Sequence, residues 1–389
     1  MDFQLTDEQR ALQDAARTFA RSELTGLARE MEEKDFSVPA DMMRRYGEMG
    51  FLGVNLPTEY GGLWLGHLEA LLVLEEFAQV SNAVAFPVFE ALVGPVRAIE
   101  RFGSDAMKAR VIPLVTAGEA TVAVSMSEPD AGTALTDLKT RAIDAGDHYV
   151  LSGSKRWTSG AGHARFYVTY CRLSEDDGAR GIGAVLVEKG MEGVSFGARE
   201  ELMGFRGIET RDIMLDEVKV PKDNLVVPAG SFGKLMSAFG LERCGNATQA
   251  LGVAAGALEQ ALAYTQERKA FGKPIVDFQA VQIKLAEMAI KVEAARLLIW
   301  RAAANAAHQP NELPSVFESS VAKCFANEIV RDVSSLGLQV MGGYGYHKAY
   351  GMEQRVRDGF AWGIAGGTTD VQKTNIAAAM VGRRFDQRR

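Results

Sequence analysis

Cysteine and histidine are scarce in this sequence, and neither residue forms a cluster. The 389 residues include three widely spaced cysteines, at positions 171, 244 and 324, and five scattered histidines. An odd number of distant cysteines argues against a disulfide framework and a four-cysteine zinc site, so we expect no metal and a cytoplasmic protein. No HExxH, GxxxxGK[ST] or GxSxG motif is present, which leaves metalloprotease, P-loop and serine-hydrolase chemistry without support.

An excess of positive charge and long apolar runs are also lacking. The formal net charge is −7, which argues against a nucleic-acid partner, because such a surface needs clustered Lys and Arg. No apolar run approaches the ~20 residues that a membrane-spanning helix needs, so we expect no membrane span. The start, MDFQLTDEQRALQDAARTFA, is acidic and lacks the basic beginning and apolar core of a signal peptide. These features predict a soluble protein.

Hydrophobic periodicity divides the chain into three parts. Residues 1–120 have the period of helices, with Thr6 as the N-cap of the first helix. Residues 121–226 contain short β-rich segments separated by Gly and Asp turns, typical of a compact antiparallel β-domain. Residues 227–389 return to the helical period, with two long helices broken at 272–274. Because all strands fall in one central block, this α+β order disfavours a Rossmann dinucleotide domain.

What the sequence does contain is a series of Gly-rich turns that carry hydroxyl groups. Such turns expose backbone N–H groups that can hold anionic or carbonyl oxygens. Each turn alone is weak evidence of a binding site, because loop formation would explain most of them. In chain order they are SEPDAGT (127–133), KRWTSG (155–160), RKAFGKPI (268–275), QVMGGYGY (339–346) and AGGTTDVQ (365–372).

In this order, the five segments resemble the motifs of the acyl-CoA dehydrogenase family of flavoproteins, over nearly the whole chain. ERKAFGKPI with Gln279 matches the family's E-R-x-x-F-G-x-P-I…Q signature closely. The resemblance implies an N-terminal α-helical domain, a central antiparallel β-barrel and a C-terminal four-helix bundle. It also implies FAD as cofactor, a homotetramer (a dimer of dimers) and an electron-transferring flavoprotein as electron acceptor. In the family reaction, a base removes the Cα proton of an acyl-CoA while the β-hydrogen leaves as hydride to flavin N5, giving the 2-enoyl-CoA.

The resemblance also assigns FAD contacts residue by residue. Met126 and Ser127 would contact the edge of the isoalloxazine ring. Trp157 would pack on the flavin, with Ser159 near N5. For Trp157 and Phe271, ordinary core packing is the alternative interpretation. The remaining assignments concern the dinucleotide or the FAD of a neighbouring subunit, and they are Arg268, Phe271, Gln279, Gln339, Gly343, Thr368 and Asp370.

The sequence departs from the family pattern at the catalytic base. Most members carry the base in a Y-E-G-T stretch, which here is Ala365-Gly366-Gly367-Thr368. Gly366 cannot accept a proton, so either the chain does not dehydrogenate or the base comes from elsewhere. Isovaleryl-CoA dehydrogenase and some long-chain members use a glutamate from the C-terminal bundle, in a stretch that Gly240-Leu241-Glu242-Arg243 resembles. The resemblance thus implies Glu242 as base, entering the space that Gly366 leaves, rather than a solvated surface glutamate. Desolvation would raise its pKa.

The resemblance implies that three residues lie near the thioester end of the substrate. Thr133 keeps the hydroxyl of the family's Ser-Asp pair, so a pantetheine or thioester contact survives there, while Ala134 loses a carboxylate. Arg243 would support the site or neutralise nearby charge, with a CoA contact as the weaker alternative. Gly366 would border the bound thioester in place of the usual base.

The acyl tail would lie beside a helix expected over residues 83–102. Ala83 stands where a glutaryl-CoA enzyme carries an arginine, which disfavours a dicarboxylic acyl group. Phe86 suggests a bulky apolar wall and a short or medium, branched or cyclic acyl group. We expect Glu90 to be solvated or capped, with contact to a polar substituent or a role as second base as alternatives.

Three functions are compatible with these residues. The first is FAD-dependent dehydrogenation of an acyl-CoA with Glu242 as base. The second is non-oxidative acyl-CoA chemistry on the same scaffold, such as desulfination, which the glycine at 366 motivates and Glu242 weakens. The third is a non-catalytic FAD-binding subunit, against which the intact flavin motifs argue.

Overall fold

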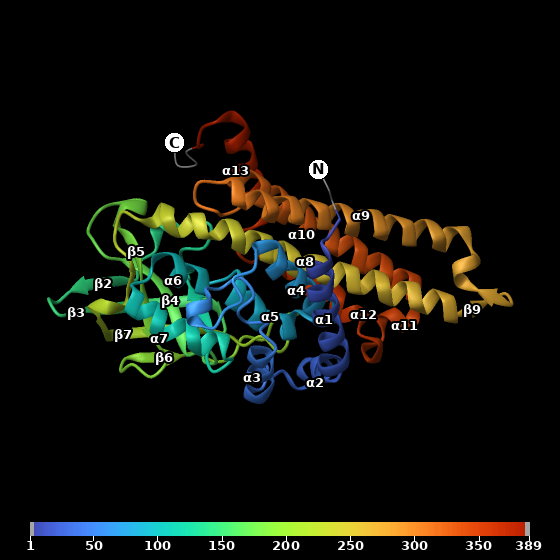
Figure 1. Ribbon diagram of the computed structural model, residues 1–389, viewed down its shortest axis with the longest axis horizontal. Helices are drawn as coiled ribbons and strands as arrows, with labels where there is room; N and C mark the ends of the chain where they lie inside the picture. Colours follow the sequence, from blue (N-terminus) through green and yellow to red (C-terminus); the bar gives the residue numbers. More distant parts are fainter. Residues whose placement is uncertain (1–3, 386–389) are drawn as a thin grey trace.

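The computed structural model describes residues 4–385 and arranges them as helices, strands and helices along the chain (Figure 1). The predicted fold class, with a central β-part between two helical parts, is confirmed. The first strand begins at Val122 and the last strand of the central sheet ends at Val227. In Figure 1 the β-part occupies one end of the molecule, and the C-terminal helices extend to the other end.

The N-terminal part packs around an aromatic cluster. Thr6 caps the first helix as predicted, in a capping box with Gln9. Phe19 and Tyr46 both pack on Phe77, with ring centroids 5.8 and 5.1 Å away. The helices are α1 (Asp7–Phe19), a π-helical turn (Ala20–Leu24), α2 (Thr25–Lys34), α3 (Ala40–Glu48), α4 (His67–Val80), α5 (Asn82–Leu92), α6 (Val96–Phe102) and α7 (Asp105–Thr116).

The single helix expected over residues 83–102 is two helices, α5 and α6, interrupted around Gly94 and Pro95. The stretch Asn82–Phe102 also corrects the statement that no apolar run approaches membrane-spanning length, because it passes that test by length and composition. Of this window, 94% is buried inside the protein. Burial among other helices explains its apolar composition, as in the core helices of large proteins.

The central part is one eight-stranded sheet with the order β6-β7-β3-β2-β4-β5-β8, and β1 pairs with β4. Most pairs are antiparallel, and the two pairs that join β4 to β1 and β2 are parallel. The ladder between β3 and β7 is irregular between Lys155 and Thr158, which is where bulges redirect side chains. The strands are β1 (Val122–Ser125), β2 (Arg141–Asp144), β3 (His148–Ser159), β4 (Phe166–Arg172), β5 (Ile182–Glu188), β6 (Val194–Phe196), β7 (Thr210–Pro221) and β8 (Leu225–Val227).

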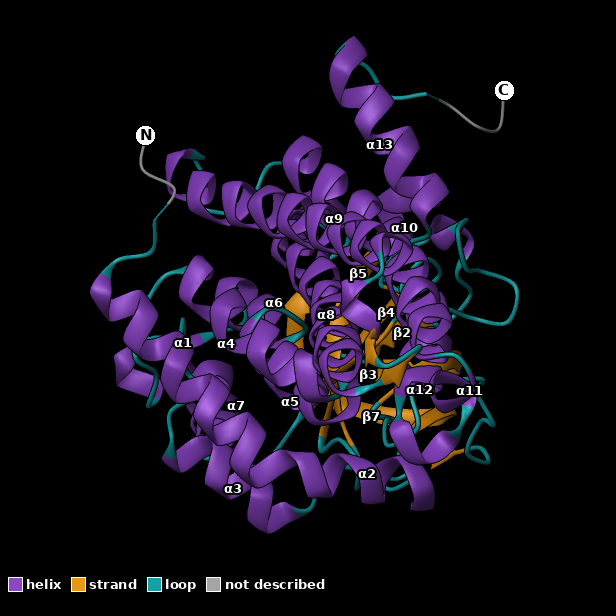
Figure 2. Cartoon of the chain, turned by 90° about the vertical axis from the view of Figure 1, so that its right-hand side faces the viewer, coloured by secondary structure: helices purple, strands orange, loops and turns teal. Residues whose placement is uncertain are grey.

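The C-terminal part is built around α8, which contacts α4, α5, α9 and α10. Figure 2 shows it nearly end-on among the helices, with the sheet behind. Glycines allow this close packing, because a Cβ at 252 would lie 2.3 Å from Ala78 Cβ. The predicted break at 272–274 is a short hairpin. The elements are α8 (Phe232–Glu267), β9 (Lys269–Ala270), β10 (Lys273–Pro274), α9 (Gln279–Ala304), α10 (Val316–Met341), α11 (Gly343–Tyr346), α12 (Met352–Ala361) and α13 (Thr369–Val381).

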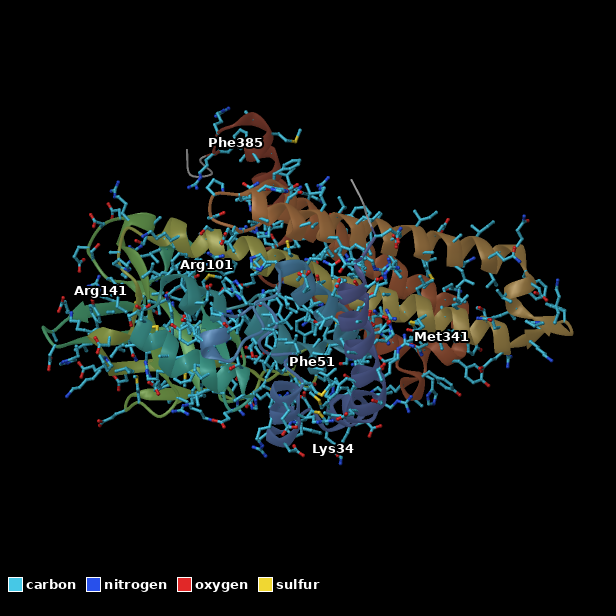
Figure 3. All side chains as sticks on the ribbon, in the orientation of Figure 1. Lys34, Phe51, Arg101, Arg141, Met341 and Phe385 are labelled. Carbon is cyan, nitrogen blue, oxygen red and sulfur yellow. The ribbon has the colours of Figure 1, made fainter. Side chains whose placement is uncertain are left out.

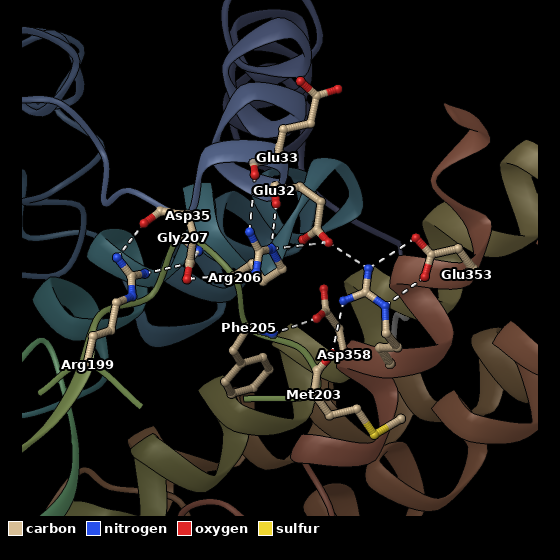
Figure 4. Close-up of polar contacts among 11 residues, drawn as sticks. Glu32, Glu33, Asp35, Arg199, Met203, Phe205, Arg206, Gly207, Glu353 and Asp358 are labelled. Atoms are coloured by element: carbon tan, nitrogen blue, oxygen red, sulfur yellow. Dashed lines mark hydrogen bonds and ion pairs between the residues drawn. The ribbon is translucent and has the colours of Figure 1, made fainter. Parts of the chain in front are cut away.

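A polar network joins the three parts beside the site (Figure 4). Arg206, in the loop between β6 and β7, donates to the carbonyl oxygen of Glu32 (2.6 Å) at the end of α2. Arg357 of α12 donates to the Glu32 carboxylate (2.6 Å). The buried Asp358 accepts a hydrogen bond from the backbone N–H of Phe205 (2.8 Å). The network therefore fixes the loop that carries Phe205 against both helical parts.

Candidate active site

Glu242 lies on α8, close to the contact between this helix and α5. A Cβ at Gly245 would lie 2.2 Å from Val93 and 3.1 Å from Phe89, so the two helices touch one turn further along. Glu242 keeps an intermediate exposure, although most of its surroundings are protein. No described residue donates a hydrogen bond to its carboxylate. Burial raises the pKa of Glu242 to about 7, opposed by the positive charges of Lys323 and Arg243.

Residues 363–368 form a loop that three polar side chains anchor through hydrogen bonds. Lys323 Nζ of α10 donates to the carbonyl oxygens of Ala365 (2.7 Å) and Gly366 (2.5 Å). Asn246 Nδ2 of α8 donates to Ala365 more weakly, at 3.5 Å. Asn327 donates to the carbonyl oxygen of Trp362 and, at 3.0 Å, to Asn246 Oδ1. The loop is thus tied to α8 and α10, directly beside the turn that carries Glu242.

The structure adds a local reason for the glycine at 366 to the one we expected. We expected a missing side chain to make room for Glu242. A Cβ at 366 would lie 3.1 Å from both Asn246 Nδ2 and Lys323 Nζ, and no Glu242 atom is among its nearest neighbours. Gly366 also has a φ of +61°, which favours glycine. Gly366 therefore serves the backbone turn and its two polar supports.

Arg243 is surrounded by protein and has unused donors. Its Nε and Nη1 atoms are buried without an acceptor among the described residues. Burial lowers the pKa of Arg243, and the charge of Glu242 opposes that shift. A guanidinium in this state can accept an additional polar or anionic partner.

Aromatic rings form an apolar wall near Glu242. Phe86 and Phe89 stack with centroids 5.7 Å apart. The ring of Trp362 lies 6.4 Å from Phe89 and 4.9 Å from Phe205. The wall therefore combines α5 with the loop after α12 and the loop after β6. Phe86 is part of a bulky apolar surface of the kind we expected.

Glu90 is buried, and the expectation of a solvated or capped side chain is wrong. It is 5% exposed, and no described residue makes a hydrogen bond to its carboxylate. Burial raises the pKa of Glu90 well above its ordinary value. Its Oε1 lies 3.1 Å from where a Cβ would stand at Gly160, next to the Trp157–Ser159 segment. The helical pattern of α5 did not reveal this position, because apolar residues surround Glu90 on all sides of the helix.

The structure brings together the flavin residues predicted in the β-part. The backbone N–H of Arg156 donates to the carbonyl oxygen of Ser127 (2.9 Å), so the Met126–Ser127 and Trp157–Ser159 segments lie side by side. Trp157 is 53% exposed with a φ of +63°, and the Arg156 guanidinium lies 4.1 Å from its ring centroid. Core packing of Trp157 is therefore wrong. The ring offers an open apolar face beside the sheet.

A second group of predicted cofactor residues lies in the C-terminal part. Arg268 and Gly343 line a cavity of about 600 Å³ together with Tyr264, Met341 and Tyr344. The neighbouring Phe271 is 96% exposed with a φ of +52°, so core packing is excluded for it too. Gln279 and Gln339 are also exposed, at the ends of α9 and α10.

The two groups belong to different parts of the chain, the β-part and the C-terminal helices. Figure 3 shows Met341, which lines the second cavity, in the helical bundle, and Arg141 of β2 on the sheet. Thr368 and Asp370 belong to neither group, because Thr368 caps α13 through Val371 N (3.2 Å) and Asp370 is exposed in the first turn of that helix. Thr133 is exposed in the turn after β1. The predicted cofactor residues therefore come from the β-part, from the far ends of α8, α9 and α10, and from the start of α13.

Sequence reasoning missed Lys323, Asn327 and Trp362. The stretch Ser319-Ser320-Val321-Ala322-Lys323-Cys324-Phe325-Ala326 did contain a signal, a lone lysine among small and apolar residues. Lysine is rarely buried without a specific partner. The contacts of Asn327 and Trp362 arise between helices far apart in the chain, and local periodicity does not show them.

Comparison with known proteins agrees with this geometry. The family models for the N-terminal, middle and C-terminal domains of acyl-CoA dehydrogenase match residues 6–119, 123–218 and 232–381. The chain is 37% identical to a 3-sulfinopropanoyl-CoA desulfinase of Paraburkholderia xenovorans, over 100% of this chain and 99% of that protein. It is 36% identical to an acryloyl-CoA reductase (NADH) of Anaerotignum propionicum, over 98% and 97%. The structure of butyryl-CoA dehydrogenase from Megasphaera elsdenii superposes with a TM-score of 0.93 at 30% identity, covering 98% of this chain and 100% of that one.

The chain belongs to the acyl-CoA dehydrogenase family. FAD is the cofactor that this membership supports, and the residues present fit it. Trp157 offers an exposed ring for stacking, and the hydroxyls of Ser125 and Thr158 are buried without partners beside it. Arg268 places a positive charge in the lining of the second cavity, where an anionic part of the cofactor would find a partner.

Proposed function

We propose that this protein dehydrogenates an acyl-CoA thioester between its α and β carbons, with Glu242 as the base. One observation carries the proposal. The loop that holds the base in most relatives contains Gly366, and a buried carboxylate with a pKa of about 7 lies beside that loop on α8. A base with a pKa near the working pH is both ionised and basic enough to take a carbon-bound proton.

Different residues of the chain have different roles in the proposed reaction. Glu242 accepts the Cα proton, and its burial keeps water from competing for that proton. The backbone at Gly366 borders the thioester, and the Trp157–Ser159 segment orients the ring system of the cofactor. FAD, when bound, supplies the acceptor for the β-hydrogen as hydride. Arg243 neutralises part of the charge that develops near Glu242.

The acyl group proposed is short or medium, branched or cyclic. The wall of Phe86, Phe89 and Trp362 is bulky and apolar. Ala83 is buried and carries no charge for a distal carboxylate. Glu90 is the polar exception in this region, and its raised pKa would let it donate a hydrogen bond to a substituent on the acyl group.

We also propose a homotetramer and an electron-transferring flavoprotein as the electron acceptor, both from the family. Cofactor residues in both the β-part and the C-terminal helices support assembly, because the family resemblance assigns Arg268 and Phe271 to the FAD of a neighbouring subunit. A cytoplasmic location stays a prediction from cysteine usage.

Non-oxidative acyl-CoA chemistry is the second candidate. Similarity over the full length to a protein named as a 3-sulfinopropanoyl-CoA desulfinase favours it. Two buried cations, Arg243 and Lys323, beside one carboxylate would also suit an anionic substituent. The buried Glu242, positioned as a base, favours dehydrogenation.

One anaerobic experiment separates the candidates. The FAD-loaded protein is mixed with a panel of saturated acyl-CoA thioesters and with 3-sulfinopropanoyl-CoA, and the visible flavin absorbance is followed while products are analysed. Bleaching with formation of an enoyl-CoA supports dehydrogenation. Release of sulfite without bleaching would contradict dehydrogenation and support non-oxidative acyl-CoA chemistry, the second candidate. The absence of any product across the panel would favour a non-catalytic subunit.

Glu242→Gln tests the base directly. Removing a general base is expected to slow flavin reduction by about 10²–10⁴-fold while FAD binding is kept, because the amide has a similar shape and cannot accept the proton. Glu259→Gln is the matched control, on the same helix but exposed and paired only with Arg21 at the surface. Parental reduction rates in Glu242→Gln, or loss of reduction in Glu90→Gln instead, would show that the base is wrongly assigned.

A further inference from the structure

Lys323 is a buried lysine with an unusual set of partners. Its side chain is 0% exposed, and it donates only to the carbonyl oxygens of Ala365 and Gly366. No described carboxylate lies in ion-pair contact with its ammonium group. Carbonyl dipoles stabilise an ammonium only in part, and a buried charge without a counter-charge costs several kcal/mol. The lysine therefore needs an opposite charge nearby or must give up its proton.

Glu242 is the opposite charge available to Lys323. Asn246 stands four residues after Glu242 and so shares its side of α8. Asn246 Nδ2 and Lys323 Nζ lie equally close, at 3.1 Å, to the point where a Cβ would stand at Gly366. The buried ammonium thus reaches the loop beside Asn246, one helical turn from Glu242 on α8.

The charged and titratable groups around this pair come from three elements. Three groups act on Glu242 or are affected by its charge. They are Lys323 of α10, Arg243 of α8 and Tyr170 of β4. Lys323 faces Glu242 and the like charge of Arg243. Burial lowers the pKa of Lys323 to about 7 and raises that of Glu242 to about 7, while the attraction between them opposes both shifts. Each group therefore favours the charged form of the other.

We propose that Lys323 is a positioning residue that keeps Glu242 ionised before substrate binds, and that it links this charge to the loop through the carbonyls of residues 365 and 366. The inference rests on the proposed function in one respect, the identity of Glu242 as base. The alternative role is a neutral anchor of the loop, a role that Asn246 and Asn327 already share. The two roles differ in whether the charge of Lys323 matters.

The test measures the protonation of Glu242 without turnover. Infrared difference spectra of the FAD-loaded protein are recorded across a pH titration, and the band of the protonated carboxyl is assigned by its loss in Glu242→Gln. Lys323→Gln removes the charge and keeps an N–H donor for the loop. We expect the midpoint of the band to rise by about one pH unit or more, a tenfold gain in proton affinity. Lys323→Met, which removes charge and donor together, should show the same rise.

Asn327→Ala is the matched control, because it removes a neutral anchor of the same loop. Its midpoint should equal that of the parent even if flavin reduction slows. An unchanged midpoint in both lysine variants would overturn the proposal and leave Lys323 as a loop anchor. If Glu242→Gln instead reduces flavin at the parental rate, the base assignment fails, while the infrared midpoint still decides whether Lys323 sets the charge of Glu242.

Discussion

At the scale of single residues, the proposed mechanism depends on one carboxylate whose pKa is raised by its protein surroundings. Resemblance to a motif singled out Glu242, whose role as base stays a prediction, because the family places a base in only a few stretches of sequence. The expected room for Glu242 beside Gly366 stays a prediction, and the structure adds that a Cβ there would crowd Lys323 and Asn246 and that a φ of +61° favours glycine. A contact between α10 and the loop after α12 leaves no local pattern, so its partners required coordinates.

The pKa of Glu242 predicts how the reaction depends on pH. A base must be ionised to accept a proton, and burial raises the pKa of Glu242 to about 7. The rate of flavin reduction should therefore fall about tenfold per pH unit below 7 and level off above it. Stopped-flow reduction by a saturating acyl-CoA between about pH 5 and pH 8 measures this. A level rate down to about pH 5 would mean that the base titrates near its ordinary value.

At the scale of elements, periodicity identified the helices with strong patterns and failed where burial is complete. Thr6 and the break at 272–274 were predicted correctly, because a cap and a Gly-Lys-Pro turn are local signals. Residues 83–102 are apolar on nearly every side, so no periodic pattern marked the interruption at Gly94 and Pro95. The same uniform burial concealed the position of Glu90.

The junction between α12 and the loop after β6 gives a prediction about stability. Burial raises the pKa of Asp358 to about 6, although Arg357 and Arg355 oppose the shift. The folded protein thus holds a proton that the unfolded chain loses near pH 4, so stability falls as pH rises from about 4 to about 6. A shift of this size corresponds to about 3 kcal/mol, fully lost above pH 6. Asp358→Asn should lack that loss and gain thermal stability relative to the parent as pH increases.

Thermal unfolding of the parent and Asp358→Asn at several pH values measures the difference. Asp177→Asn is the control, because Asp177 is exposed in the β-part and its replacement should leave the pH dependence of the parent unchanged. If thermal stability depended on pH in the same way for the parent and Asp358→Asn, Asp358 would have an ordinary pKa. The stability of the junction would then not depend on its charge.

At the scale of the whole molecule, the proposed tetramer needs a contact surface between copies of the chain. The exposed side of α9 carries a surface suited to that contact. Ile283, Ile290 and Leu297 are 54%, 69% and 39% exposed and stand seven residues apart, so they lie along one side of the helix. Exposed apolar stripes of this kind mark association surfaces.

Ile290→Lys should therefore dissociate the proposed tetramer and lower FAD content together, because the charge would be buried in the contact and the second group of cofactor residues would be withdrawn from the partner's site. Light scattering gives the mass, and the ratio of flavin to protein absorbance gives the FAD content. Ile143→Lys is the control, since Ile143 is 58% exposed on β2, away from α9. A smaller assembly that kept its full FAD would show that one chain binds the cofactor alone. An unchanged mass would show that this side of α9 is not the contact.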